Sequence, residues 1–104
     1  MHAFITHMRA KPGKRDEVIR LTTGMLEQTR GEDGVPVYIF STATESPDDF
    51  WFYDVYESEA ASAAHQATEA FRATMPALME VADLVAAIKL DPYGPVKIVP
   101  PGEG

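Results

Sequence analysis

The chain has 104 residues, of which 45% are hydrophobic and 24% are charged. This size and composition predict a single globular domain that buries its own core, and they exclude a largely disordered chain. The absence of cysteine excludes disulfides, thiolate metal sites and cysteine nucleophiles. Because phosphate groups are bound by clustered Lys and Arg, the formal net charge of −7 argues against nucleic acid as a partner.

The sequence gives no sign of a membrane or a metal. The N-terminal segment lacks the apolar core of a signal peptide, and no run approaches the ~18 apolar residues that a membrane span needs. We therefore expect a cytoplasmic protein that has no membrane partner. The three histidines are His2, His7 and His65, and no two of them stand at ligand spacing on one element, so we expect no metal site.

The first half of the chain predicts a strand, a helix and a second strand. Residues 2–9 alternate weakly, as in a strand, and the Lys11-Pro12-Gly13-Lys14 segment breaks that strand. A helix is expected from there to about residue 30. Its core stripe, at helical spacing, is Val18, Leu21, Thr22 and Met25. Residues 35–44 read as the second strand, and the turn chemistry of residues 46–49 predicts an antiparallel hairpin with the strand that follows.

That third strand, residues 50–56, is crowded with aromatic side chains. Because strand side chains alternate between faces, two sets are expected on opposite faces of the sheet. One set is Trp51, Tyr53 and Val55, and the other is Phe50, Phe52, Asp54 and Tyr56. A strand with one solvent-exposed face alternates apolar and polar residues, and this strand does not. Both of its faces therefore need cover.

The second half predicts two helical segments and a closing strand. Ser58 is the expected N-cap of the second helix. The expected inner stripe of this helix is Ala61, Ala64, Thr68 and Phe71. Residues 74–76, Thr-Met-Pro, predict a break before a short helix, because proline is tolerated in a first helical turn. Residues 84–90 alternate as the last main strand; residues 96–99 are expected to add a short edge strand, and residues 100–104 a frayed tail.

This element order is βαββαβ, the ferredoxin-like α+β arrangement with an antiparallel sheet, in one domain over residues 1–99. Two helices then cover one face of the sheet, yet the second and third strands carry large apolar groups on both faces. An exposed apolar patch of that size indicates an interface or a binding groove. We expect a homodimer in which two sheets face each other and enclose a cavity.

In their order and spacing, several segments resemble the antibiotic biosynthesis monooxygenase (ABM) family, whose fold is a dimeric α+β barrel. The resemblance covers roughly residues 3–90. It is carried by Lys11-Pro12-Gly13-Lys14, by the aromatic strand running into Tyr56-Glu57-Ser58, and by Ala61 to His65 followed by Phe71. Some members have a second histidine just before this phenylalanine, where the present chain has Ala70.

The resemblance implies a small oxygenase that uses O₂ without metal, flavin or haem and acts on a quinol or polyphenol. An electron-rich phenol, quinol or enol can itself reduce O₂ once it is deprotonated. The protein then has to supply a dry apolar pocket, a proton acceptor and orientation. His65 is the expected catalytic residue, because a neutral imidazole accepts a proton at physiological pH. The alternative is a structural histidine, bonded to a strand carbonyl or to a partner subunit.

Five further residues are expected to bind substrate. Trp51, Tyr53 and Tyr38 could line a pocket for an aromatic compound, although core or dimer packing explains such residues equally well. His7 could place a proton acceptor in the cavity, or lie at an edge. Asp54 stands among aromatics and is costly to bury unpaired, so it either faces solvent or pairs with an Arg or a hydroxyl at the pocket rim.

Three other functions stay open. A non-catalytic ligand-binding or interaction dimer would keep the same fold, and an isomerase or cyclase would need acid–base groups but no oxygen. A related branch of the fold degrades haem, with a Trp and a later His on the second helix and an Asn on the first strand. The matching positions here are His65 and Met75, and the first strand contains no Asn.

Overall fold

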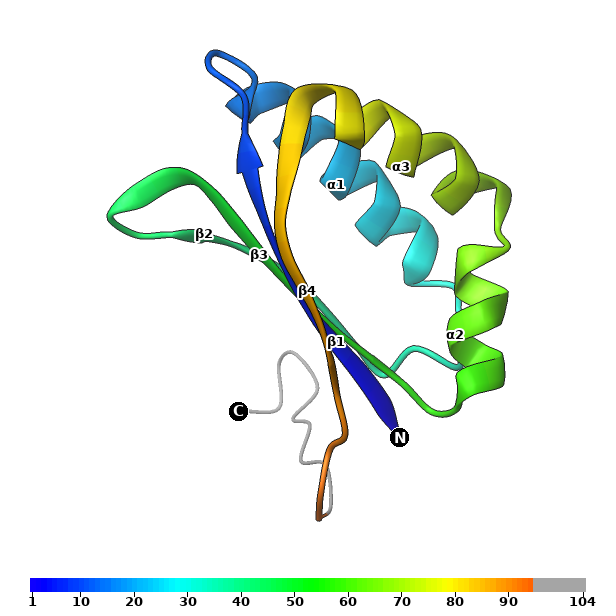
Figure 1. Cartoon of the computed structure of the whole chain (residues 1–104). Coiled ribbons are helices and arrows are strands. Elements are labelled where there is room, and N and C mark those ends of the chain that lie inside the picture. Colours follow the sequence, from blue (N-terminus) through cyan, green and yellow to red (C-terminus); the bar gives the residue numbers. More distant parts are fainter. Residues whose placement is uncertain (95–104) are drawn as a thin grey trace, which may run out of the picture.

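A computed structural model of the chain describes residues 1–94 and shows an α+β domain with a four-stranded antiparallel sheet (Figure 1). The elements in chain order are β1 (His2–Ala10), α1 (Arg15–Thr29), β2 (Val37–Ala43), β3 (Ser46–Tyr56), α2 (Glu59–Gln66), α3 (Glu69–Val81) and β4 (Ala82–Leu90). The strand order is β2-β3-β1-β4. This confirms the ferredoxin-like fold class. The expected edge strand 96–99 and tail 100–104 lie outside the described residues.

All three helices pack on one face of the sheet, which we call the inner face (Figure 1). The core lies between these helices and the inner face. Its buried members are Met8, Ala10, Val18, Phe50, Phe52, Leu78 and Ala82. Phe50 and Phe52 have even numbers in β3, so strand alternation predicts correctly that they share one face.

The opposite, outer face of the sheet has no helix over it within residues 1–94. One row of paired residues crosses all four strands on this face: Ile39, Tyr53, Ile5 and Ile88. Ile39 and Ile88 at its two ends are 52% and 51% exposed, and Trp51 beside the row is 40% exposed. Much of the outer face is therefore an exposed apolar surface.

The hairpin between β2 and β3 turns earlier than its sequence indicates. The turn lies at residues 44–45, and residues 46–49, expected to form it, already belong to β3. Long-range pairing accounts for the difference, because Asp49 stands opposite Arg9 of β1 and its carboxylate accepts a hydrogen bond from the Arg9 guanidinium at 2.9 Å. That contact extends β3 through residues whose local preference is a turn.

The expected helix break at residues 74–76 is wrong, since α3 runs unbroken through Pro76. The break lies instead at residues 67–68, where the Thr68 hydroxyl caps α3 by accepting the Phe71 N–H at 3.2 Å. Proline removes one helical hydrogen bond, and packing of α3 on α1 and the core offsets that loss.

The expected inner stripe of α2 is also wrong in part. Because the chain bends at residues 67–68, α2 turns Ser62 and His65 inward, and they are 4% and 1% exposed. Ala64, expected on the inner side, is exposed instead. The bend therefore decides that His65 is the innermost large side chain of this helix.

Candidate functional site

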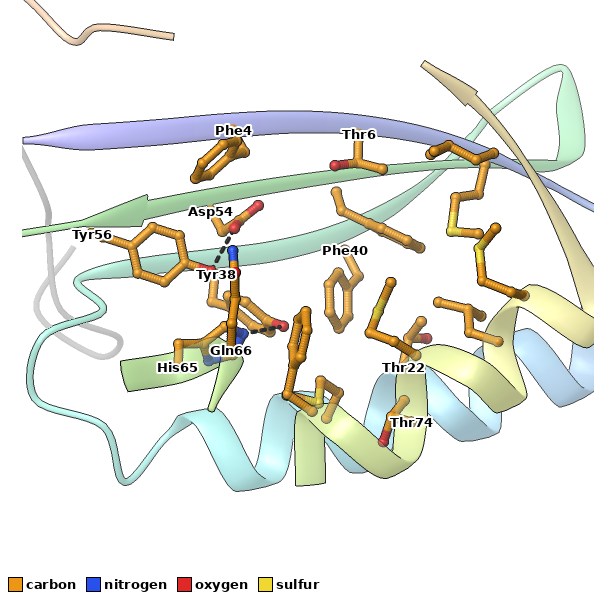
Figure 2. A pocket seen from close by; sticks show the side chains of 18 residues that line it. Phe4, Thr6, Thr22, Tyr38, Phe40, Asp54, Tyr56, His65, Gln66 and Thr74 are labelled. Atoms are coloured by element: carbon orange, nitrogen blue, oxygen red, sulfur yellow. Dashed lines mark hydrogen bonds between the residues drawn. The ribbon is translucent and has the colours of Figure 1, made fainter. Parts of the chain in front are cut away.

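A cavity of about 210 Å³ lies between the inner face of the sheet and the helices (Figure 2). Most of its wall is apolar, from Phe4, Met8, Met25, Phe40, Phe52, Phe71, Met75, Leu78, Met79 and Leu84. Most of the polar side chains gather at one end, where Figure 2 shows Tyr38, Asp54, Tyr56, His65 and Gln66 close together, and three threonines line other parts of the wall. The site is an apolar chamber with a cluster of acid–base and hydroxyl groups at one end.

His65 is held at this polar end by hydrogen bonds on both ring nitrogens. Its Nδ1 lies 2.9 Å from Glu32 Oε1, and its Nε2 lies 3.3 Å from the Tyr38 hydroxyl. An ionised carboxylate only accepts hydrogen bonds, so Nδ1 carries a hydrogen, and in the neutral ring Nε2 is then the acceptor and the tyrosine the donor. His65 therefore presents a basic nitrogen toward the cavity end, with the Tyr38 hydroxyl between them.

The helix that carries His65 is short and defined by its caps. The Ser58 hydroxyl accepts the Ala61 N–H at 3.1 Å, as expected for an N-cap. At the other end the Thr68 hydroxyl donates to the His65 carbonyl at 2.8 Å. These two contacts fix both ends of α2, and with them the position of the imidazole.

Asp54 and Tyr56 form a second polar pair in the same cavity. The Tyr56 hydroxyl donates to Asp54 Oδ2 at 2.6 Å, so Asp54 is paired with a hydroxyl, one of the two environments expected for it. Burial raises the pKa of Asp54, and the bond from Tyr56 opposes that rise. Burial also raises the pKa of Tyr56, and the neighbouring Asp54 raises it further.

Tyr38 joins the two pairs. It stands directly opposite Asp54 in the β2–β3 register, on the inner face, and its hydroxyl reaches His65. Burial raises the pKa of Tyr38, with smaller contributions from Asp54 and Glu32. Its hydroxyl therefore stays protonated at neutral pH and can donate one hydrogen bond while it accepts another.

The structure divides the residues selected from the sequence into two groups. His65, Tyr38 and Asp54 line the cavity, whereas Trp51, Tyr53 and His7 lie on the outer face. The fold therefore places Tyr38 on the opposite face of the sheet from Trp51 and Tyr53. Tyr38 stands opposite Asp54, and because strand side chains alternate between faces, the odd-numbered Trp51 and Tyr53 lie on the other face.

The outer-face group has its own contacts. The His7 ring stacks on Trp51, with centroids 4.0 Å apart and planes 11° from parallel. His7 Nε2 lies 2.8 Å from Asp49 Oδ1, which also accepts from Arg9. Bonds from Ser46 and His7 lower the pKa of Asp49 to about 2. His7 is thus tied to the Asp49 carboxylate on the outer face and does not line the cavity.

Sequence patterns did not single out two residues of the hydrogen-bonded cluster, Tyr56 in the cavity wall and Glu32 behind His65. Tyr56 could have been found, because it shares a face with Asp54 two residues away on the same strand. Glu32 could not, because it lies in the loop after α1 and meets His65 across 33 residues of sequence. No local pattern marks such a contact.

Comparison with known proteins identifies the class. The sequence pattern of the antibiotic biosynthesis monooxygenase family matches residues 1–77, and the chain belongs to this family.

Solved structures share the fold. A crystal structure of an antibiotic biosynthesis monooxygenase is 26% identical, with a TM-score of 0.82 over 90% of this chain and 100% of its own. A candidate family member from Deinococcus radiodurans is 20% identical (TM-score 0.82; 96% and 100% covered), and one from Bacteroides thetaiotaomicron is 22% identical (TM-score 0.86; 94% and 95% covered). A search of curated proteins found no match.

Residues 1–94 show neither a metal-binding cluster nor a membrane-spanning helix. No group of three or more His, Asp or Glu side chains is arranged there to hold a metal ion. None of the helices is long and apolar enough to cross a membrane. The cytoplasmic location expected from the sequence stays a prediction.

Proposed function

We propose that the protein is a cofactor-independent monooxygenase that oxidises a quinol or polyphenol with O₂, and that His65 accepts the substrate proton. The observation that carries the proposal is the buried imidazole, 1% exposed, at the polar end of an otherwise apolar cavity. A base needs a fixed lone pair that can take the proton, and the contacts of His65 orient Nε2 toward the Tyr38 hydroxyl, which lines the cavity. Membership of the ABM family supports the same reaction class.

The chemistry needs no separate reductant. In an anthrone-like substrate a ring CH₂ becomes C=O, one atom of O₂ enters the product, and the other leaves as water. The substrate supplies the electrons once it has lost a proton and become an electron-rich anion. The apolar wall of the cavity suits this step, because a water-excluding site strengthens the electrostatic interactions that hold the anion.

The cavity sets limits on the substrate. At about 210 Å³ it is smaller than the ~300–1,000 Å³ of pockets for drug-sized ligands, so a compact aromatic fits best. Its oxygen substituents would lie at the polar end, near Tyr38 and Asp54. The ring would lie among Phe40, Phe52 and Phe71, where edge-to-face contacts are available.

We propose that two copies associate through their outer faces. The exposed row that ends in Ile39 and Ile88 is the kind of continuous apolar patch that marks an interface. Trp51, Tyr53 and His7 would then lie between the two sheets. Dimer packing is one of the roles that the sequence allows for Trp51 and Tyr53. Substrate contact would then be made by residues of the inner face, such as Tyr38 and Asp54.

The test is oxygen consumption by purified, metal-stripped protein offered a panel of simple quinols and anthrone-like phenols. Saturable uptake well above the uncatalysed autoxidation rate, with stoichiometric product, is the expected result. Uptake no faster than autoxidation for every compound, in protein shown to be a folded dimer, would overturn the proposal.

A second candidate is a dimer that binds a small aromatic compound without turning it over. Ala70 favours it, because some family members carry a histidine at that position, whereas His65 is the one imidazole among the residues that line this cavity. Saturable binding of panel compounds by calorimetry, without oxygen uptake or any other product, would identify this function. A product formed without oxygen uptake would point to isomerase or cyclase chemistry instead.

A further inference from the structure

The loop between α1 and β2 delivers one carboxylate to the inner side of α2. Glu32 lies in this loop, its side chain is 19% exposed, and its Oε1 is 2.9 Å from His65 Nδ1. The other oxygen, Oε2, is buried and has no hydrogen-bond partner among the described residues. A buried acceptor without a partner is unfavourable, so stability alone does not explain a carboxylate here.

The backbone holds this loop tightly against α2. Gly34 approaches Ala61 so closely that a Cβ on Gly34 would stand 2.8 Å from the Ala61 Cβ, and the Gly34 carbonyl accepts the Glu57 N–H at 3.0 Å. The Glu32 N–H in turn donates to the Thr29 carbonyl at 2.9 Å at the end of α1. Backbone contacts to the end of α1 on one side and to α2 on the other therefore fix the position of Glu32.

We infer that Glu32 is the positioning residue of the site: it holds the hydrogen of His65 on Nδ1, so that Nε2 receives the substrate proton through the Tyr38 hydroxyl. This inference rests on the proposed role of His65. In the transfer, the substrate O–H breaks as its proton moves to the Tyr38 oxygen, and the Tyr38 O–H breaks as its proton moves to Nε2. Tyr38 ends neutral, the substrate becomes an anion and His65 becomes an imidazolium.

Glu32 has a second effect in the same step. Its carboxylate lies 2.9 Å from Nδ1, beside the imidazolium that forms, and stabilises the charged ring in the way the triad carboxylate does in a serine protease. Without Glu32 the neutral ring is free to adopt its intrinsically preferred Nε2–H form. Nε2 would then donate to Tyr38 and could no longer accept from it.

The experiment reads the tautomer of His65 directly, by ¹⁵N NMR of histidine-labelled protein without substrate. We expect wild-type His65 in the Nδ1–H form and Glu32→Leu shifted toward the Nε2–H form. Asp33→Asn is the matched control, because it removes a charge from an exposed neighbour in the same loop. A wild-type ring in the Nε2–H form, or a Glu32→Leu ring unchanged from wild type, would overturn the inference.

Activity supplies the second readout. Glu32→Ala removes the Nδ1 acceptor and the charge with a smaller side chain, so it serves if Glu32→Leu fails to fold. We expect the kcat of Glu32→Ala to fall at least tenfold while KM changes less than threefold, and a wild-type kcat would overturn the inference. If the wild type itself consumes no oxygen, the proposed function fails, and the NMR result still decides whether Glu32 positions His65.

Discussion

The two faces of β3 carry similar residues in very different environments. On the inner face, Asp54 and Tyr56 line a cavity beside His65, and their ionisation is suppressed by burial. On the outer face, Trp51 and Asp49 accompany His7 away from that cavity, and Asp49 ionises more readily than usual. Each face thus pairs a histidine with a carboxylate and aromatics.

The difference teaches that a position beside the cavity, and not residue type, separates the candidate site from the outer-face cluster. Both imidazoles lie within 3 Å of a carboxylate oxygen, His65 of Glu32 and His7 of Asp49. Only His65 also faces an apolar cavity with its second nitrogen. Proton chemistry is therefore expected on the inner face, and association between copies on the outer face.

The largest effect is expected from His65→Ala. Removing a general base typically costs ~10²–10⁴ in rate, so turnover in the oxygen-uptake assay should fall by at least about 100-fold. We expect the dimer to stay folded by circular dichroism and sedimentation. His7→Ala is the matched control on the outer face and should keep most of the activity. Wild-type turnover in folded His65→Ala would remove this residue from the mechanism.

The next largest effect is expected from Ile88→Asp, which places a carboxylate in the exposed row of the outer face. Burying an unpaired charge is costly, so the dimer Kd measured by sedimentation should rise at least about tenfold, equivalent to ~1.4 kcal/mol. Ala73→Asp, at an exposed position of α3, is the control and should leave Kd unchanged. An unchanged Kd for Ile88→Asp would place the dimer interface elsewhere.

A moderate effect is expected from Asp54→Asn on the pH dependence of stability. The pKa of Asp54 in the folded state is raised above its ordinary value of 3.8. At pH values between the ordinary pKa and the raised pKa, the folded state therefore binds more protons than the unfolded state. The free energy of unfolding therefore falls as pH rises through this window, by about 1.4 kcal/mol for each unit of pKa difference.

Urea unfolding at a series of pH values from 3.8 upward checks the prediction. The fall in the free energy of unfolding with rising pH should be weaker in Asp54→Asn than in the wild type. Asp48→Asn, an exposed position of the same strand, is the control and should follow the wild type. Parallel curves for Asp54→Asn and the wild type would show that burial does not control Asp54.

The smallest effect is expected from Asp49→Asn on the outer face. The pKa of Asp49 is lowered to about 2, so its contribution to stability is present above its ordinary pKa of 3.8 and is lost as the pH falls toward 2. Thermal melts should show a slightly lower Tm for the variant at neutral pH and no difference near pH 2, with turnover unchanged. A large loss of turnover would mean that the outer-face cluster takes part in the reaction.

Local pattern was enough for most of the fold. Alternation in β3 assigned its residues to the correct faces, and Ser58 was recognised as a cap because capping depends on neighbouring residues. The hairpin turn and the helix break were misplaced, because distant contacts override local preference there. Asp49 is held in β3 by β1, and Pro76 is tolerated in α3 by packing.

The sequence by itself determined the element order, the family resemblance and the choice of His65 as the residue to test. It did so because periodicity, capping and motif spacing are properties of neighbouring residues. Only the tertiary structure decided which candidates meet. It separated Tyr38 and Asp54 from Trp51 and Tyr53 through strand register, and it brought Glu32 to His65 across a loop. Register and loop placement follow from the packing of the whole chain, which no single segment specifies.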